Sequence, residues 1–233
     1  MYVILNMYDL KLEKGDRMKN IFKKYGIIIN NEELLLTALT HSSYSNEHEG
    51  TCYERLEYLG DATLEIVCSD YLYNNTEESE GEMSRLRRLY VCENALYEYS
   101  KELDYVKHIR LGNGITEANK TIIADVFEAL IAVVYLESGL DSVKKIFNEL
   151  IVPYIKRKDD FLMDYKSLLQ ESVQTVKKSV TYNLVEESGP AHHKVFKSQV
   201  IIDDLVYGEG IGFTKKEAEQ NAAKDALRKK ANV

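Results

Sequence analysis

Acidic side chains at helical spacing are the first residues of this chain whose types suggest chemistry. Glu54, Glu57, Asp61 and Glu65 follow one another at intervals of three and four residues. In a helix predicted over about residues 53–72, this spacing places all four on one face. The plain interpretation is a solvated acidic face. The glycine directly before Asp61 speaks against this interpretation, because glycine lets another backbone approach closely and a solvated face would not need that.

A second pair of carboxylates interrupts an apolar segment. Residues 122–134 are apolar almost throughout, which predicts a buried helix. Asp125 and Glu128 nevertheless lie one turn apart on it. A buried carboxylate is costly unless it is paired or bound to metal. Two interpretations stay open: salt bridges to Arg or Lys, or a divalent-metal site in which Glu57 and Asp61 face this pair.

The predicted ligands are all carboxylate oxygens, with no His or Cys. Such a set suits Mg²⁺ or Mn²⁺ better than zinc. A carboxylate-bound Mg²⁺ is suited to phosphoryl chemistry, because it activates water, orients a phosphate and stabilises the leaving oxygen. These residues alone do not specify which phosphate compound is the substrate.

Overall charge speaks against a broadly basic nucleic-acid-binding surface. The chain has 233 residues, which suits one large or two small domains, and its net charge is −8. Residues 1–158 hold 19 Lys and Arg against 26 Asp and Glu, and residues 159–233 hold 11 against 12. Any binding of RNA must therefore use basic side chains gathered on one face.

Cysteine usage and hydropathy predict a cytoplasmic protein. The three cysteines are an odd number without a CxxC pair, which argues against a disulfide framework or zinc cluster and fits a reducing compartment. The longest apolar run, residues 122–135, is too short and too charged to span a bilayer. The N-terminus lacks the pattern of an export signal. We expect no membrane partner.

The pattern of apolar residues changes near residue 160. Before it, helices are predicted around residues 18–25, 32–36, 53–72, 81–90, 94–103, 120–137 and 142–156, with Asn31 as a cap and Gly139 as a stop. After a charged hinge come a helix, three strands at Thr181–Glu187, Val195–Ile202 and Leu205–Phe213, and a helix from Thr214 with Glu217 as its capping box. The predicted fold is an all-α domain followed by a small α+β (αβββα) domain.

The segment Glu54–Asp61, ERLEYLGD, resembles the signature of the ribonuclease III family, whose common form has phenylalanine in place of Tyr58. Three other segments resemble that family in the same order along the chain: residues 40–44, 80–84 and 123–130. The resemblance runs from about residue 15 onward. It implies an N-terminal extension at 1–14, a catalytic domain at 15–156, a linker at 157–163 and a double-stranded-RNA-binding domain at 164–233.

The resemblance also implies roles for particular residues. Metal coordination falls to Glu57, Asp61, Asp125 and Glu128, of which Asp61 and Glu128 match the pair called catalytic. Glu54 and Glu80 match acidic residues that place RNA at the edge of the cleft. Tyr58 matches the phenylalanine that enters a socket on the partner of a homodimer. Tyr53 stands where asparagine is usual, and we expect this departure to change local contacts without loss of chemistry.

Residues 164–233 resemble a double-stranded-RNA-binding domain. The matching RNA-contacting residues are Ser167, Gln170, Glu171 and Gln174 on the first helix, His192 in the loop, and Lys215 and Lys216 at the start of the last helix. Lysines oppose the dipole at a helix start, so their position there makes more sense beside a phosphate. Glu219 occupies a position where some members carry lysine, so we expect modest, salt-sensitive affinity.

The function implied is hydrolysis of double-stranded RNA with Mg²⁺, or Mn²⁺ as a substitute, and without a small-molecule cofactor. Ribosomal RNA precursors and other structured RNAs would be cut to 5′-phosphate and 3′-hydroxyl ends. Two alternatives stay open. One is a non-catalytic RNA-binding or ribosome-associated protein with the same fold, against which the four intact carboxylates speak. The other is a metal phosphohydrolase for small molecules, against which residues 164–233 speak.

Overall fold

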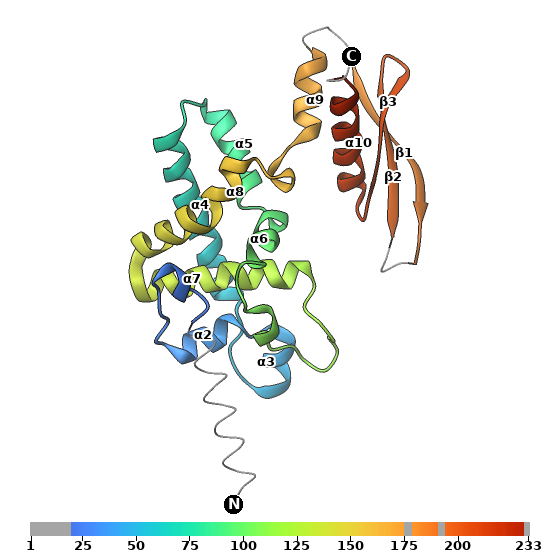
Figure 1. The fold of residues 1–233 in the computed structure, drawn as a ribbon. Helices are drawn as coiled ribbons and strands as arrows, with labels where there is room; N and C mark the ends of the chain where they lie inside the picture. Colours follow the sequence, from blue (N-terminus) through green and yellow to red (C-terminus); the bar gives the residue numbers. More distant parts are fainter. Residues whose placement is uncertain (1–19, 175–178, 191–193, 231–233) are drawn as a thin grey trace, which may run out of the picture. The chain divides into compact units, whose positions relative to one another are not determined.

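The computed structural model describes residues 20–174, 179–190 and 194–230 (Figure 1). The chain divides after Leu162 into two compact units. The predicted extension at 1–14 lies outside the described residues, and the predicted limits of linker and domains stay predictions. Among the residues that the structure describes, no helix is both long enough and apolar enough to cross a membrane.

Helices form the first unit. They are η1 (Lys23–Tyr25), α2 (Glu32–Ala38), α3 (Ser42–His48), α4 (Glu54–Asn75), α5 (Glu80–Tyr90), α6 (Glu93–Ser100), η2 (Val106–His108), α7 (Lys120–Ile146), η3 (Phe147–Ile151), α8 (Val152–Arg157) and η4 (Asp160–Leu162). One isolated parallel bridge joins Thr40 to Arg110. The predicted cap is confirmed, since the Asn31 side chain accepts a hydrogen bond from the N–H of Leu34 at 3.0 Å.

The apolar helix α7 lies in the core of the first unit and packs against α4, α6 and α2 (Figure 1). Residues 129–134 of α7 are fully buried, as their unbroken apolar sequence predicts. The backbone leaves helical geometry at Gly139, with φ 76° and ψ 176°, where the sequence predicts a stop. The core therefore fixes the side of α7 that carries Asp125 and Glu128 against α4.

The helix predicted over residues 142–156 is not one regular helix. It consists of the end of α7, the π-helical turn η3 and then α8. Pro153 in the first turn of α8 explains the interruption. Because proline has no N–H, it cannot donate the hydrogen bond that a regular helix would require there, and the preceding turn widens.

The second unit has the predicted αβββα order. Its elements are α9 (Tyr165–Gln174), β1 (Val180–Ser188), β2 (Val195–Ile202), β3 (Leu205–Gly212) and α10 (Lys215–Lys230). The strands form an antiparallel sheet in the order β1-β2-β3. Asp203 and Asp204, both at positive φ, make the tight turn between β2 and β3. The predicted fold class is confirmed for both units.

Both helices of the second unit pack on one face of its sheet (Figure 1). Alternate residues of β2 point into this core, including Val200 and Ile202. The helix α10 lies very close to β3, because a Cβ at Gly210 would come within 2.2 Å of the Ala222 nitrogen. Glycine on the strand and alanine on the helix thus allow backbone to lie against backbone.

Candidate active site

The two helices that carry the acidic residues touch through their backbones at Gly60. A Cβ built on Gly60 would lie 1.9 Å from the carbonyl oxygen of Glu128, closer than real atoms approach. Only glycine fits this contact. Glu57 and Asp61 lie on either side of Gly60 along α4, so the contact brings them beside Glu128 on α7. The glycine in the sequence thus predicted the close approach correctly.

The electrostatics of the site link Glu128 and Glu57 to the acidic side chains around them. Burial, followed by the charges of Asp61, Glu57 and Asp125, raises the pKa of Glu128 from 4.5 to about 8. Burial, followed by Asp125, Glu54 and Asp61, also raises the pKa of Glu57. Like charges disfavour ionisation of their neighbours, so these shifts indicate a shared acidic region.

Within the part of the chain that the structure describes, no Lys or Arg pairs with the four carboxylates. This removes the salt-bridge interpretation of Asp125 and Glu128. In the same described segments, no three acidic, His or Cys side chains already stand close enough to share one ion. Coordination by these four residues therefore stays a prediction.

Tyr53 is a member of the site whose role the sequence reasoning missed. Its ring is buried, and its hydroxyl donates a hydrogen bond of 3.2 Å to Oδ2 of Asp125. Burial is the main cause of a raised pKa at Asp125, and the bond from Tyr53 partly offsets it. The expected local change at Tyr53 is thus a direct contact with a predicted metal ligand.

The predicted cleft-edge residues lie in different surroundings. Glu54 is exposed at the first turn of α4 and contributes to the raised pKa of Glu57. Glu80 is exposed at the first turn of α5 and accepts a hydrogen bond of 3.1 Å from the Ser84 hydroxyl. Glu80 is not among the groups that raise the pKa of Glu57, Asp125 or Glu128. Glu54 therefore acts on one of the four carboxylates, and the role of Glu80 at the cleft edge stays a prediction.

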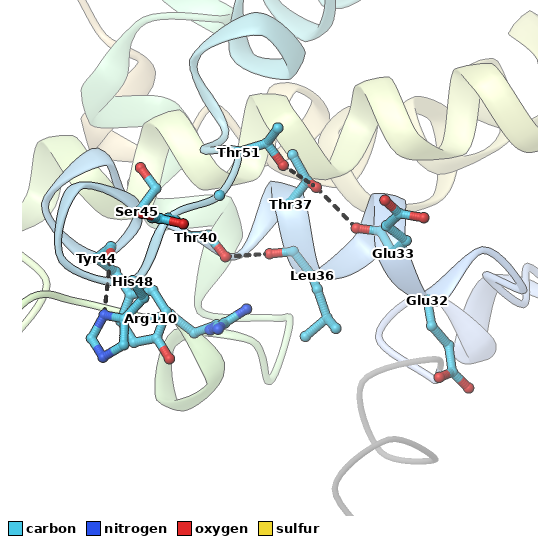
Figure 2. A pocket seen from close by; sticks show the side chains of 12 residues that line it. Glu32, Glu33, Leu36, Thr37, Thr40, Tyr44, Ser45, His48, Thr51 and Arg110 are labelled. Carbon is cyan, nitrogen blue, oxygen red and sulfur yellow. Dashed lines mark hydrogen bonds between the residues drawn. The ribbon is translucent and has the colours of Figure 1, made fainter.

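A separate hollow of about 450 Å³ lies on the first unit between α2 and α3 (Figure 2). The Arg110 guanidinium stacks over the Tyr44 ring at 4.1 Å, and His48 stacks on the same ring. Glu32, Glu33 and Glu49 also line the hollow. None of the four site carboxylates lines it, so this hollow and the candidate active site are different places.

Charge pairing within the second unit singles out two lysines. Four others are paired to carboxylates: Lys166 with Glu219, Lys194 with Glu187, Lys197 with Glu209 and Lys229 with Asp225. Lys215 and Lys216 are exposed at the start of α10 and form no ion pair within the described residues. These two cations are therefore available to phosphates.

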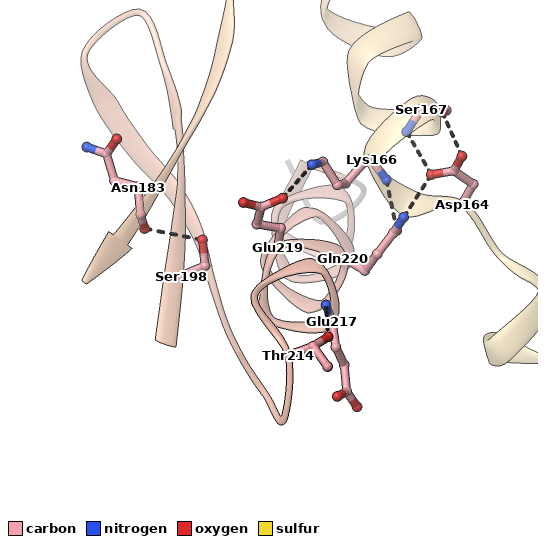
Figure 3. Close-up of polar contacts among 9 residues, drawn as sticks. All are labelled: Asp164, Lys166, Ser167, Asn183, Ser198, Thr214, Glu217, Glu219 and Gln220. Carbon is pink, nitrogen blue, oxygen red and sulfur yellow. Dashed lines mark hydrogen bonds and ion pairs between the residues drawn. The ribbon is translucent and has the colours of Figure 1, made fainter. Parts of the chain in front are cut away.

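The first-helix residues predicted to contact RNA are only partly open. Gln170 and Glu171 are exposed on α9. The Ser167 hydroxyl instead donates to Oδ2 of Asp164 at 2.8 Å, and the Ser167 N–H donates to Oδ1 at 3.2 Å (Figure 3). Asp164 therefore caps the start of α9. His192 and the side chain of Gln174 lie outside what the structure describes.

A polar clamp, formed by Asp164, Lys166, Glu219 and Gln220, joins the start of α9 to α10. Lys166 pairs with Glu219 at 2.5 Å (Figure 3). The Gln220 amide donates to Asp164 at 2.9 Å and accepts from the N–H of Lys166 at 3.1 Å. Glu219 thus has an internal partner at a position where lysine would face RNA. Its pairing with a residue 53 positions away gave no signal in the sequence.

Comparison with known proteins decides the family. A model described as "Ribonuclease-III-like" matches residues 31–155, and a double-stranded RNA binding motif matches residues 165–230. Ribonuclease 3 of Onion yellows phytoplasma is 42% identical over 92% of this chain and 93% of its own. Ribonuclease 3 of Clostridium perfringens is 41% identical over 94% and 97%. The chain belongs to the ribonuclease III family.

Solved structures of ribonuclease III nuclease domains are also similar to this chain. The nuclease domain of ribonuclease III from Campylobacter jejuni has a TM-score of 0.52 and 29% identity, covering 57% of this chain and 95% of that one. Membership of the family, together with the RNA binding motif, makes this chain an endoribonuclease that cuts double-stranded RNA. The family also implies a requirement for a divalent metal.

The raised pKa of Glu128 predicts how stability depends on pH without metal. Since the folded-state pKa of about 8 exceeds the ordinary 4.5, stability falls as pH rises between these values. Replacement by glutamine, E128Q, removes this fall. We expect metal-free E128Q to exceed the wild type by about 1–2 kcal/mol in unfolding free energy at pH 8, after allowance for solvent screening.

Urea unfolding in EDTA at pH 5 and pH 8 measures this effect. The matched control is E65Q, a carboxylate of α4 outside the four site residues, which should keep the pH dependence of the wild type. Parallel stability curves for wild type and E128Q across this range would contradict the prediction.

Proposed function

We propose that Glu57, Asp61, Asp125 and Glu128 hold Mg²⁺, with Mn²⁺ as a substitute, for hydrolysis of double-stranded RNA. The observation that carries this proposal is that Asp61, Glu57 and Asp125 raise the pKa of Glu128, while none of the four forms an ion pair with any described Lys or Arg. Oxygen donors suit a hard divalent cation. The close contact of the two helix backbones at Gly60 supports the proposal, because it places Glu57 and Asp61 beside Glu128.

Each carboxylate has a position suited to its task. Bound Mg²⁺ would supply water activation and charge stabilisation at the scissile phosphate. Asp61 is exposed and can face RNA. Glu128 and Asp125 are partly buried and can hold the metal ion from the protein side. Water adds to phosphorus and the 3′ oxygen leaves with a proton, which gives 5′-phosphate and 3′-hydroxyl ends. Glu54, beside Glu57, and Glu80 would help to place the RNA.

The substitution D61N tests this proposal. It removes one ligand charge, so we expect the single-turnover rate on long duplex RNA in Mg²⁺ to fall by more than about 100-fold, the upper loss for residues that only support a ligand. Duplex binding in a gel shift should stay unchanged.

The matched control for D61N is D70N. Asp70 lies on the same helix and pairs with Lys144 at 2.9 Å, away from the four carboxylates. Its loss should leave the rate intact. An undiminished Mg²⁺-dependent rate in D61N would defeat the proposal, and a wild type that binds duplex without cutting it would identify a non-catalytic binding protein.

We further propose that the first unit forms a homodimer through α4. Its outer face carries a row of exposed apolar side chains at helical spacing: Tyr58, Ile66 and Tyr73, which are 81%, 57% and 76% exposed. Such rows mark interaction surfaces. The similar nuclease domain from Campylobacter jejuni has a region involved in dimer formation. The Tyr58 hydroxyl needs a hydrogen-bond partner once it is buried there.

Sedimentation of a Y58R variant tests the homodimer. A charge buried in this interface has no partner, so we expect Y58R to sediment as the 26.8 kDa monomer while the wild type sediments as a dimer. V106R is the control, since Val106 is another exposed apolar residue, 39% exposed, outside the row on α4. A dimeric Y58R, or a monomeric wild type, would rule out this interface.

For the second unit, we propose that Lys215 and Lys216 contact phosphates while α9 reads the minor groove through Gln170, Glu171 and neighbouring residues. The absence of ion pairs at both lysines within the described residues supports this role. Such a domain spans roughly 16 base pairs and reads A-form shape. Ser167 would contribute mainly by holding the helix start, given its bonds to Asp164.

The double variant K215A/K216A should bind duplex RNA more weakly, with a less steep salt dependence. Each lost phosphate contact lowers the slope of log affinity against log salt by about 1. We therefore expect a decrease of about 2, measured by fluorescence anisotropy across a salt series. The control is K229A on the same helix, because Lys229 already pairs with Asp225. An unchanged slope in the double variant would exclude these contacts.

A further inference from the structure

Tyr53 links the two helices that carry the proposed metal ligands. It directly precedes α4, and its own carbonyl accepts the first hydrogen bonds of that helix, from the N–H groups of Leu56 and Glu57. Its side chain crosses to α7, where the hydroxyl donates to Oδ2 of Asp125 at 3.2 Å. Only 3% of Tyr53 is exposed. The residue thus fixes its own position on one helix and holds a side chain of the other.

The backbone of Tyr53 is itself anchored from behind. Its N–H donates to the carbonyl of Thr40 at 2.9 Å. That segment is held in turn, because the Arg110 N–H donates to Leu39 at 2.7 Å and the Arg110 carbonyl accepts from His41 at 3.0 Å. Figure 2 shows Thr40 and Arg110 beside each other at the hollow. Tyr53 therefore starts from a rigid base.

The ring of Tyr53 is packed against His41, with ring centroids 5.7 Å apart. His41 Nδ1 accepts from the Ser43 N–H at 3.1 Å, and the same nitrogen forms a hydrogen bond of 2.8 Å with the Ser43 hydroxyl. The Ser43 oxygen accepts in turn from the N–H of Gly112 at 2.9 Å. This chain of bonds fixes the imidazole, and the imidazole fixes the tyrosine ring.

The Tyr53 hydroxyl leaves one oxygen of Asp125 uncommitted. Within the described residues, the bond from Tyr53 to Oδ2 is the one side-chain hydrogen bond that Asp125 receives, and Asp125 has no ion pair. Oδ1 thus stays available to a cation. A phenol suits this task because it donates without competing as a charged ligand.

We propose that Tyr53 is a positioning residue, which orients Asp125 so that Oδ1 faces the carboxylates of α4 and can bind the divalent metal. This inference rests on the proposed metal site. Loss of the hydroxyl would free the Asp125 side chain to rotate, so that part of the binding free energy would be spent on ordering it. Supporting hydrogen bonds of this kind typically change metal affinity by about 10–100-fold.

The variant Y53F tests this role because it keeps the ring and removes only the hydroxyl. We expect its Mn²⁺ affinity, titrated by electron paramagnetic resonance on the full chain without RNA, to fall by about tenfold. The Mg²⁺ concentration for half-maximal single-turnover cleavage should rise by the same factor. Affinity for duplex RNA in the absence of metal should not change.

Tyr105 offers a matched control. It is also buried, and its hydroxyl donates to α7, at the carbonyl of Ile123 at 2.7 Å, without touching a carboxylate. Y105F should keep the Mn²⁺ affinity of the wild type even where thermal unfolding shows lower stability. Equal Mn²⁺ affinity in Y53F and wild type would overturn the positioning role, as would equal weakening in both variants. A wild type that binds no Mn²⁺ would instead overturn the metal site itself, and the inference with it.

Discussion

The burial of the Glu128 carboxylate among like charges is the constraint on which the first unit depends. Its position is unfavourable by itself, because burial and three neighbouring acids disfavour ionisation. The side chains of residues 129–134 on the same helix are fully buried, and burying such residues contributes about 1.5–3 kcal/mol each. The apolar core therefore holds together an acidic group that would otherwise push its two helices apart.

The second unit faces a different electrostatic constraint, because a chain with net charge −8 must bind RNA, which is a polyanion. Residues 1–158 and residues 159–233 of the chain each hold more acidic than basic side chains. Four lysines of the second unit, Lys166, Lys194, Lys197 and Lys229, are already paired with carboxylates. Lys215 and Lys216 form a small cationic area, where the N–H groups of the helix start add a favourable dipole. Local arrangement, and not net charge, determines the sign that RNA meets.

Much of this was predictable from the sequence, because the informative patterns are local. Spacing of three and four residues predicted the acidic face of α4, and the glycine before Asp61 predicted the helix contact. Alternating strands and the Thr214 cap predicted the second unit; its hydroxyl accepts from the Glu217 N–H at 3.1 Å. The sequence left two interpretations open for Asp125 and Glu128, and the described residues supply no Lys or Arg for the salt-bridge one.

The features that escaped prediction depend on contacts between distant segments. Tyr53 lies 72 positions before Asp125, and the pair has no periodicity that would reveal it. The same is true of Lys166 and Glu219, where the sequence shows only that a lysine is missing from α10. The π-helical turn before Pro153 escaped for another reason, since apolar spacing in a wide turn resembles that of an ordinary helix.

Gly60 has a consequence for how freely this enzyme can diverge. Main-chain atoms, and not side chains, set the separation of α4 and α7 at the site. Side chains around the contact can then differ without altering the spacing of the two helices. The spacing of the site is therefore unaffected by changes in the surrounding side chains, whereas position 60 accepts only glycine.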